Sequence, residues 1–413
     1  MKIKPFRGLR PARDKVHLVA SRPYDVLDSS EARVEAAGNP VSFLRVVKPE
    51  ITLPEDVDHH APEVYEAARD NFKKLVDDGV FFQDTRDCLY LYELTMNGRS
   101  QDGIVACASV QDYMEGKIKK HELTRPDKEA DRKSHVRVSM MNAEPVFFAY
   151  PASVDIDRMV DRIKEHEPEY SFVTDDAIKH RFWVIADQDK IDGLVGAFSD
   201  IPATYVADGH HRTAAAALVG ADLRRENPSH SGEEEYNYFL AVHFPDDQLT
   251  ILDYNRVVKD LNGHTPASLL AALRRSLDVT RVGADEFKPT ALHEFGMYLD
   301  GTWYKLIAST GTYDDADPIG GLDVTILSKE ILEPLLNIHD LRTDKRIDFV
   351  GGMRGLAELK RRVDSGEMKV AFALFPVSMK QVIAIADSGK IMPPKTTWFE
   401  PKLRSGLVVH SLV

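Results

Sequence analysis

The chain has 413 residues, of which 43% are hydrophobic and 29% are charged, and its formal net charge at pH 7 is −13. This length predicts two or three domains with a sizeable core, and the composition excludes a disordered or fibrous protein. Because the acidic excess repels the phosphate backbone, it also argues against bulk binding of nucleic acid.

Segments that would carry the chain out of the cytoplasm are not evident in the sequence. Residues 1–13 include basic side chains, but no apolar stretch of the length used in secretory signals follows them. No window approaches the roughly 18 apolar residues that a membrane span needs. The two cysteines, Cys88 and Cys107, fall in neighbouring predicted strands, which favours free thiols in a reducing compartment. We therefore expect a soluble cytoplasmic protein with no membrane partner.

In chain order, the first strongly periodic element is a helix. Apolar side chains recur at helical spacing over 62–76, with a proline in the first turn and a glycine past the end. Two apolar or alternating runs follow at 88–94 and 103–110. They are separated by Asn97-Gly98 and a short polar stretch, which predicts a hairpin with a long loop.

Further along, strands and helices follow one another without strict alternation. Strands are predicted at 145–150, 181–186, 203–207, 237–244, 249–254 and 370–375, with a hairpin turning at 300–301. Helices are predicted at 191–198, after residue 212, and at 266–277, 322–336 and 356–363. This mixed order predicts an α/β (α+β) fold. We expect three regions: an N-terminal α/β region at 1–115, a core at 116–262, and a C-terminal α/β region at 263–413 with a Pro-rich tail.

The densest group of side chains that could bind or react with a ligand is Asp-Gly-His-His-Arg at 208–212. It lies between the strand predicted at 203–207 and an alanine-rich helix. Such a turn presents free backbone N–H groups and the positive end of a helix, which favours phosphate or carboxylate. Gly209 lets the backbone approach a ligand closely, and Arg212 is a bidentate phosphate donor. The two histidines can donate hydrogen bonds or transfer protons, and Asp208 can hold a divalent metal or orient a histidine.

Two simpler explanations of this segment are weaker. A helix cap with surface histidines and a paired arginine needs only one of the five groups and leaves the others without a reason. A zinc site is disfavoured because adjacent histidines point in different directions on a helix and lack the i, i+4 spacing of shared ligands. The segment is therefore predicted to be an anion site.

A second dense patch, at 119–132, alternates acids, bases and imidazoles. A solvated helix face accounts for such a pattern as well as a functional site does. Glu122 precedes Pro126, which favours a turn before a helix over an exposed helical face. The position of Glu122 in the chain therefore supports a functional role for it.

The C-terminal stretch 392–406 is rich in proline and carries Trp398, Phe399 and several cations. Such a segment either straps the core or wraps into a site and delivers Lys395 or Arg404 to an anion. The pattern favours neither interpretation over the other.

Several landmarks in order resemble the bacterial and archaeal domain-of-unknown-function family 1015, from Phe6 to the end of the chain. They are Pro23-Tyr24-Asp25-Val26, Asn39-Pro40, His121-Glu122 with Thr124, Asp131-Arg132, the 208–212 segment, Asn255-Arg256 and Met392-Pro393-Pro394-Lys395. More distantly, the middle third resembles the ParB-like nucleotide-binding fold, whose relatives include partition proteins, sulfiredoxin and free-serine kinases. The Asp-Gly-His-His-Arg turn looks like its phosphate-binding box, and the flanking regions would be elaborations of that core.

The second resemblance implies a mechanism. In the free-serine kinases a His-Glu pair precedes the box and its glutamate is the catalytic base, and His121-Glu122 is the matching pair. Since 86 positions separate Glu122 from Asp208, an insertion over roughly 150–185 has to be assumed. The resemblance implies phosphoryl transfer from ATP or ADP, with Mg²⁺, to the hydroxyl of free L-serine, which gives O-phosphoserine.

The resemblance also implies site residues. Catalytic roles fall to Glu122, Asp208, His210 and His211, and phosphate or nucleotide binding to Gly209, His210, His211, Arg212 and Thr213. Substrate binding falls to His121, Thr124, Arg125, Asn255, Arg256, Lys395 and Arg404, and the metal to Asp208. The alternatives are a ParB-like nucleotide-binding regulatory protein and a phosphohydrolase or kinase for another small metabolite. The net charge and the lack of a basic helix-turn-helix region argue against the first. The donor, the metal and the oligomeric state, including a homodimer, stay open.

Overall fold

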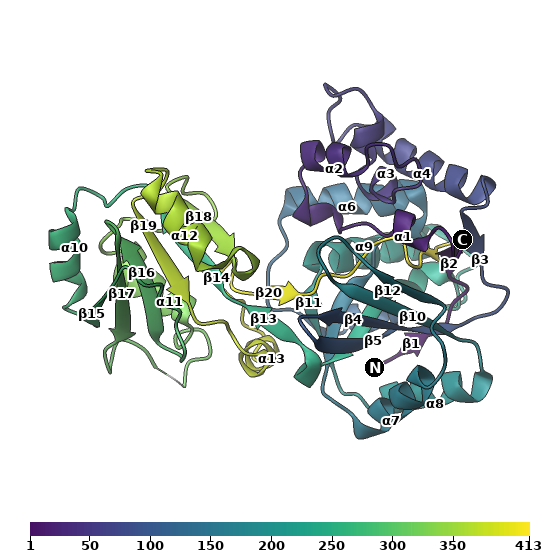
Figure 1. Cartoon of the computed structure of the whole chain (residues 1–413). Helices are drawn as coiled ribbons and strands as arrows, with labels where there is room; N and C mark the ends of the chain where they lie inside the picture. The colour runs from purple at the N-terminus through teal and green to yellow at the C-terminus, as the bar shows by residue number, and fades with distance from the viewer. Residues whose placement is uncertain (315) are drawn as a thin grey trace. The chain divides into compact units, whose positions relative to one another are not determined.

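The computed structural model describes residues 1–314 and 316–413, which form two compact units (Figure 1). Unit 1 comprises Met1–Leu249 and Pro401–Val413, and unit 2 comprises Thr250–Glu400. The mixed α/β class predicted from the sequence is confirmed. The unit boundaries differ from the three predicted regions, because strands from 1–115 and from 116–262 pair in one sheet and so form a single unit.

A nine-stranded sheet forms the centre of unit 1, in the order β6-β11-β8-β12-β5-β4-β10-β9, with β1 on β5. Its strands are β1 Ile3–Lys4, β4 Leu89–Met96, β5 Arg99–Ser109, β6 Ile118–Lys119, β8 Val146–Tyr150, β9 Tyr170–Val173, β10 Lys179–Ile185, β11 Thr204–Asp208 and β12 Tyr238–Pro245. Most pairs are antiparallel, but β11 pairs with β6 in parallel and β12 pairs with β8 in parallel. The β6–β11 pair matters most for the site described below.

Helices cover both faces of this sheet (Figure 1). The α-helices of unit 1 are α1 Val16–Val19, α2 Ser29–Glu35, α3 Leu44–Val47, α4 Pro62–Asp77, α5 Val110–Met114, α6 Pro126–Ser139, α7 Val154–Lys164, α8 Gln188–Ser199 and α9 His210–Glu226. The buried apolar faces of α7 and α8 pack on strand residues such as Leu91, Phe148 and Trp183. A second apolar cluster around Phe43 and Phe72 joins α2, α3 and α4. The helix predicted at 62–76 is thus confirmed.

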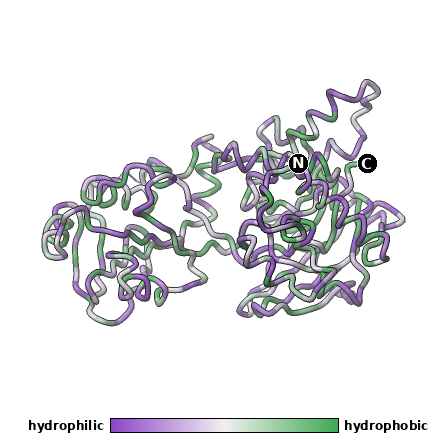
Figure 2. The backbone as a smooth tube through the Cα atoms, turned by 90° about the horizontal axis from the view of Figure 1, so that it is seen from above, coloured by the Kyte–Doolittle hydropathy of each residue, from purple (hydrophilic) through white to green (hydrophobic). Residues whose placement is uncertain are grey.

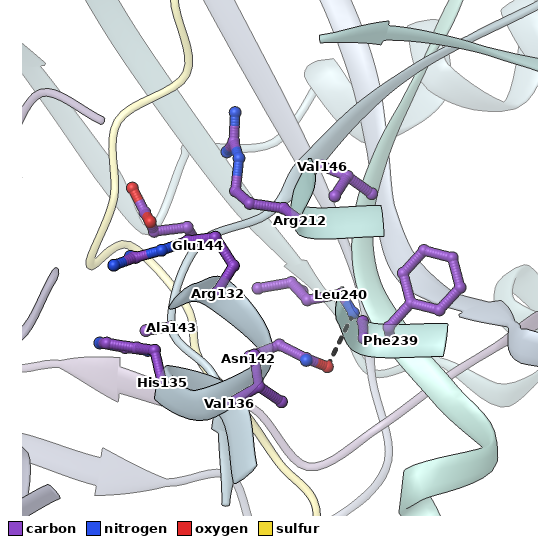
Figure 3. Close-up of a pocket in the computed structure, with 11 residues that line it drawn as sticks. Arg132, His135, Val136, Asn142, Ala143, Glu144, Val146, Arg212, Phe239 and Leu240 are labelled. Atoms are coloured by element: carbon purple, nitrogen blue, oxygen red, sulfur yellow. Dashed lines mark hydrogen bonds between the residues drawn. The ribbon is translucent and has the colours of Figure 1, made fainter. Parts of the chain in front are cut away.

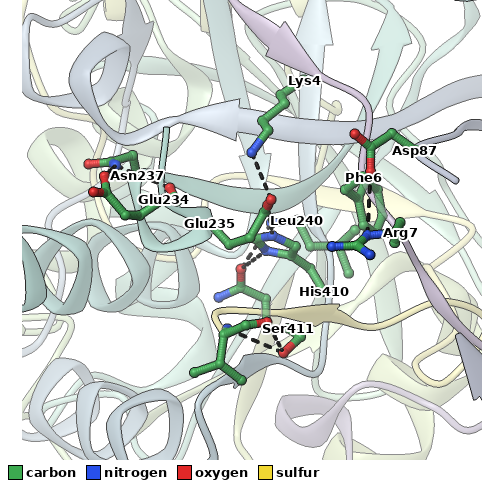
Figure 4. A network of polar contacts seen from close by, with 12 residues as sticks. Lys4, Phe6, Arg7, Asp87, Glu234, Glu235, Asn237, Leu240, His410 and Ser411 are labelled. Carbon is green, nitrogen blue, oxygen red and sulfur yellow. Dashed lines mark hydrogen bonds and ion pairs between the residues drawn. The ribbon is translucent and has the colours of Figure 1, made fainter. Parts of the chain in front are cut away.

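Two short strand pairs tie the ends of the chain into unit 1. They are β2 Leu9–Pro11 with β3 Phe81–Gln83, and β7 Met141–Asn142 with β21 His410–Ser411. His410 hydrogen-bonds Asn142 at 2.9 Å and Glu235 at 3.0 Å, and Lys4 pairs with Glu235 at 2.8 Å (Figure 4). This partly buried network holds the C-terminal segment against the core of unit 1.

A six-stranded antiparallel sheet, ordered β15-β17-β16-β19-β14-β18, forms unit 2. Its strands are β14 Tyr254–Val258, β15 Leu277–Gly283, β16 Glu294–Leu299, β17 Thr302–Ala308, β18 Ile347–Gly351 and β19 Val370–Leu374, and a separate pair joins β13 Thr250–Leu252 to β20 Trp398–Glu400. Its helices are α10 Pro266–Leu273, α11 Asp323–Leu327, α12 Gly355–Asp364 and α13 Met379–Asp387. The core gathers around Tyr298, Trp303 and Leu359.

Some predicted elements differ from the structure in their bounds, and three of them show why. The hairpin loop is not long: Asn97 and Gly98, both at positive φ, form a two-residue turn and β5 begins at once. The strand predicted at 249–254 is two strands, interrupted at Asp253. The helix predicted at 266–277 ends at Leu273, because Leu277 already pairs in the sheet. In each case, tertiary pairing or turn geometry sets the boundary.

The predicted thiol state is also found, since Cys88 and Cys107 are buried and form no disulfide. In the described ranges of the chain, no helix is both long and apolar enough to cross a membrane. Figure 2 shows hydrophobic stretches of the chain interrupted repeatedly by hydrophilic ones.

Candidate functional site

The parallel pairing of β6 with β11 brings together two motifs that lie far apart in the sequence. Thr204 pairs with Ile118 and Tyr205 with Lys119. Because parallel strands end at the same edge of a sheet, the loop that follows β6 lies beside the turn that follows β11. Within this arrangement, Nδ1 of His210 lies 3.6 Å from Oε2 of Glu122.

The residues that lie between these two motifs in the sequence do not keep the motifs apart in the fold. The segment 150–185, assumed from the sequence to be an insertion, forms α7, β9 and β10, and these elements extend or cover the same sheet. The 120–125 segment is a turn before α6 and not a helix face, as the position of the proline predicted.

Gly209 occupies the turn between β11 and α9. Its φ of 93° is in the left-handed region, where a glycine is favoured. A Cβ atom at this position would lie 3.0 Å from Nε and 3.1 Å from Cζ of Arg212, so the missing side chain also makes room for the guanidinium. The first N–H groups of a helix have no acceptor within the helix, and α9 presents them at this turn. The turn therefore has the geometry of an anion cradle.

Asp208 is held between two cations. Its Oδ2 accepts from Nη2 of Arg212 at 3.0 Å, and its Oδ1 accepts from Nζ of Lys402 at 3.3 Å. Arg212 is only 8% exposed, and its Nη1 donates to the carbonyl of Pro145. Burial by itself raises the pKa of Asp208. The positive charges of Lys402 and Arg212 lower this pKa by more than burial raises it, and the net result is a pKa of about 2. Asp208 is therefore ionised at every physiological pH.

Lys402 is a site residue that the sequence did not single out. Of the C-terminal cations, Lys395 and Arg404 were the predicted ones, yet it is Lys402 that reaches Asp208. Its only sequence signal was its place in the proline-rich cationic stretch. Arg404 lies two residues further on and pairs instead with Asp176 and Thr174.

Two histidines of these motifs, His121 and His210, are buried and neutral. His121 and His210 pack edge to face, with ring centroids 4.6 Å apart. Burial lowers the pKa of His121 to about 4 and the pKa of His210 well below its ordinary value. Nε2 of His210 is buried and has no hydrogen-bond partner in the described chain. His211 accepts the backbone N–H of Arg125 at 3.0 Å, so it anchors the 120–125 loop to α9.

A pocket opens between this loop and the start of α9. It is lined by Tyr113, Lys120, Glu122, Leu123, Thr124, Val206, His210 and Thr213. The side chain of Glu122 is about one-third exposed. The hydroxyl of Thr213 donates to the carbonyl of Gly209, and that of Thr124 donates to Glu129. The pocket thus offers a carboxylate, a lysine and a neutral imidazole beside a helix N-terminus.

A second hollow lies beside α9 (Figure 3). Of its charged residues, Arg212 was predicted to bind phosphate, Arg132 was named only as a landmark, and Glu144 was not named. Arg132, Glu144 and Arg212 line it. The short helical turn η1 Tyr24–Val26 packs nearby: N–H of Tyr24 donates to Oε1 of Glu144 at 3.0 Å, and the guanidinium of Arg132 stacks on the Tyr24 ring at 4.2 Å. The landmarks at 23–26 and 131–132 therefore belong to one cluster with Arg212.

Three predicted substrate-binding residues belong to unit 2 and are engaged there. Asn255 is fully buried, donates to Asp253 and accepts the N–H of Leu374 at 2.9 Å. Arg256 is 1% exposed and donates to the carbonyl of Lys395 at 2.9 Å. These contacts tie β14 to the C-terminal part of unit 2. A role in substrate binding stays a prediction for these residues.

The fold is that of a mixed α/β protein in which a strand-to-helix turn follows the carboxyl end of β11. The chain belongs to the family described as "Protein of unknown function (DUF1015)", whose family model matches residues 3–325. The family predicted from the sequence landmarks is thus confirmed. No curated protein matches the chain.

Several solved structures are similar to the chain at low identity. A conserved hypothetical protein from Pyrococcus furiosus has 14% identity and a TM-score of 0.35, with 73% of this chain and 95% of that one covered. A free serine kinase in complex with AMP has 13% identity and a TM-score of 0.35, with 73% and 91% covered. C-terminally truncated SbnI from Staphylococcus aureus has 14% identity and a TM-score of 0.38, with 72% and 82% covered.

Proposed function

We propose that this protein is a small-molecule kinase that transfers a phosphoryl group from a nucleotide, ATP or ADP, to the hydroxyl of free L-serine. The observation that carries the proposal is the position of Glu122, whose carboxylate lies 3.6 Å from His210 at the start of α9. A candidate base and a candidate phosphate site thus share one pocket. The sequence resemblance to the free-serine kinases implies this pairing.

The turn at 208–212 would bind the phosphates of the donor. Phosphoryl transfer asks a protein mainly for positioning and for neutralisation of negative charge. The N–H groups that begin α9, the guanidinium of Arg212 and the ammonium of Lys402 supply both. His210, neutral and with Nε2 directed to no protein acceptor, would donate to or accept from a ligand at the same point.

Glu122 would accept the proton of the serine hydroxyl as the oxygen attacks the phosphorus. A general base has to lie within hydrogen-bond reach of the acceptor hydroxyl, and Glu122 lines the pocket with its carboxylate partly exposed. Lys120 and Thr124 line the same pocket and would orient the acceptor. His211 would keep the loop in place through its bond to Arg125.

Magnesium would enter with the nucleotide. Within residues 1–314 and 316–413, no three His, Cys, Asp or Glu side chains gather as a metal centre. Mg²⁺ commonly uses one or two carboxylates together with substrate phosphates, and Asp208, which adjoins the phosphate cradle, fits that role. When bound, the ion would neutralise charge on the transferred group.

The experiment is mass-spectrometric detection of O-phosphoserine after incubation of the purified protein with L-serine, Mg²⁺ and ATP, ADP or pyrophosphate in turn. We expect product with a nucleotide donor and its loss in Glu122→Gln. Glu226→Gln, at the exposed far end of the same α9, is the matched control and should keep full activity. Phosphate release without phosphoserine would instead indicate a phosphohydrolase, and salt-dependent DNA binding would indicate a partition-type regulator.

A further inference from the structure

The loop that carries Glu122 is held at each end by an imidazole. At its start, His121 is 1% exposed, hydrogen-bonds the backbone of Val206 and packs against the ring of His210. At its end, the backbone N–H of Arg125 donates to Nε2 of His211 at 3.0 Å. The first of these contacts is buried, whereas the second lies at the surface of the protein. The two ends of the loop are therefore fixed by contacts of different kinds.

The middle of this loop forms one wall of the candidate pocket and is open to solvent. Glu122, Leu123 and Thr124 line the pocket from the loop, together with residues of α5, β11 and α9. Leu123 is 59% exposed, so the tip of the loop is not packed into the core. A change in the position of the loop would therefore move Glu122 and open this wall of the pocket.

The contact of His211 with the loop depends on the protonation state of the imidazole. A neutral imidazole has one nitrogen that accepts, but a protonated one has two N–H donors and no acceptor. Protonation of Nε2 would place an N–H group against the N–H of Arg125 and leave that backbone donor without its acceptor. Since His211 is only partly buried, whereas the adjacent His210 is buried and stays neutral, solvent protons reach His211 first. The bond that closes the loop exists only while His211 is neutral.

Charged groups from neighbouring segments also act on His211. Burial has the largest effect and lowers the pKa of His211, and the charge of Arg125 lowers it as well. Asp25 on η1 and Asp127 and Glu129 on α6 act in the opposite direction, and the net pKa lies below the ordinary value of 6.5. Because a lowered pKa favours the neutral form in the closed loop, the stabilisation is complete above pH 6.5 and is lost as the pH falls through the lowered pKa.

We propose that His211 is the latch of a movable loop, and that the loop swings open about His121 when Nε2 of His211 is no longer an acceptor. In the closed state Glu122 is held beside His210, and in the open state the carboxylate leaves that position. His211 is then a positioning residue that acts through the loop, in place of the catalytic and phosphate-binding roles that the sequence predicted for it. The inference concerns the regulation of the proposed kinase site, and its effect on turnover rests on that proposed function.

Hydrogen–deuterium exchange followed by mass spectrometry tests the latch in the unaltered protein. After correction for the intrinsic pH dependence of exchange, the protection of segment 120–125 should be about tenfold lower at pH 5 than at pH 7.5, the effect of losing one hydrogen bond and leaving its donor unpaired. His211→Gln, whose side-chain oxygen accepts but does not titrate, should be equally protected at both pH values. His59→Gln, at an exposed histidine ahead of α4, is the control and should behave as the parent. Equal protection at both pH values in the parent, or a pH dependence that survives in His211→Gln, refutes the latch.

The second test removes the acceptor. His211→Leu should exchange in segment 120–125 as fast at pH 7.5 as the parent does at pH 5, and its kcat for phosphoserine formation at pH 7.5 should fall about tenfold. Its Kd for ATP, measured by calorimetry, should stay within about twofold of the parent, because the loop carries Glu122 and the phosphates bind at the turn 208–212. His211→Gln should restore kcat. A Kd for ATP that rises as much as kcat falls would overturn the latch and would support direct phosphate binding by His211.

The exchange experiment requires no turnover, so its outcome is separate from that of the proposed kinase. A loop that loosens in acid and in His211→Leu supports the latch even if no phosphoserine forms. Phosphoserine formation by His211→Leu with the kcat of the parent refutes the latch and leaves the kinase standing.

Discussion

Replacement of Asp208 by Asn tests the ion pairs that Asp208 forms with Arg212 and Lys402. The pKa of Asp208 is about 2, against an ordinary value of 3.8, because Lys402 and Arg212 outweigh the effect of burial. At 1.36 kcal/mol for each pKa unit, this difference corresponds to about 2 kcal/mol of folding free energy at neutral pH. Asp208→Asn keeps the shape but loses the charge, so it should lower the free energy of unfolding by about that amount.

The direction in which this stability difference changes with pH follows from the same pKa. Since the folded pKa is depressed, the stabilisation is fully present above the unfolded pKa of 3.8 and is lost as the pH falls toward 2. The difference between parent and variant should therefore be constant from neutral pH down to about pH 4 and should then shrink. Urea unfolding followed by circular dichroism at pH 7 and near pH 2.5 measures it, with exposed Asp161→Asn on α7 as the control. Equal stability at pH 7, or a difference that does not change with acid, would refute the reasoning.

Two further predictions concern the same turn. Gly209→Ala should destabilise the fold by about 1–3 kcal/mol, since the residue has φ of 93°, and should weaken ATP binding because the new methyl group displaces Arg212. Denaturant unfolding and calorimetric titration check it, and parent-like values for both would contradict the assigned geometry. Because burial keeps the pKa of His210 well below its ordinary value, the transfer rate should show no histidine step between pH 6 and 8. A kcat profile with an inflection near 6.5 that disappears in His210→Gln would show that the imidazole is charged in the working enzyme.

The C-terminal segment illustrates how structural and chemical roles combine in one stretch of chain. It is tied to the core through His410 and β21, and it also delivers Lys402 to Asp208. The sequence left strap and cation delivery as alternatives, and in unit 1 both occur. The amine that reaches Asp208 is nevertheless not one of those predicted, because the path of the C-terminal segment through the fold decides which cation comes near.

Local patterns in the sequence were enough to predict the mixed α/β class, the helix at 62–76 and the strand-to-helix turn at 208–212. These patterns are hydrophobic periodicity, the conformation of glycine and the geometry of a helix N-terminus. Each acts over a few residues, so each can be recognised in a single sequence. The turn that carries Glu122 was also predictable, since a proline follows it closely.

Only the tertiary structure decided which distant residues share the site. Glu122 meets His210 because β6 and β11 pair in parallel, and the cluster of Tyr24 with Glu144 joins positions 120 residues apart. The contact of Lys402 with Asp208 has no local signature in the sequence, because a cation in a loop fits many surroundings. Long-range strand pairing supplies these contacts, and no periodicity within one segment encodes the partner of another.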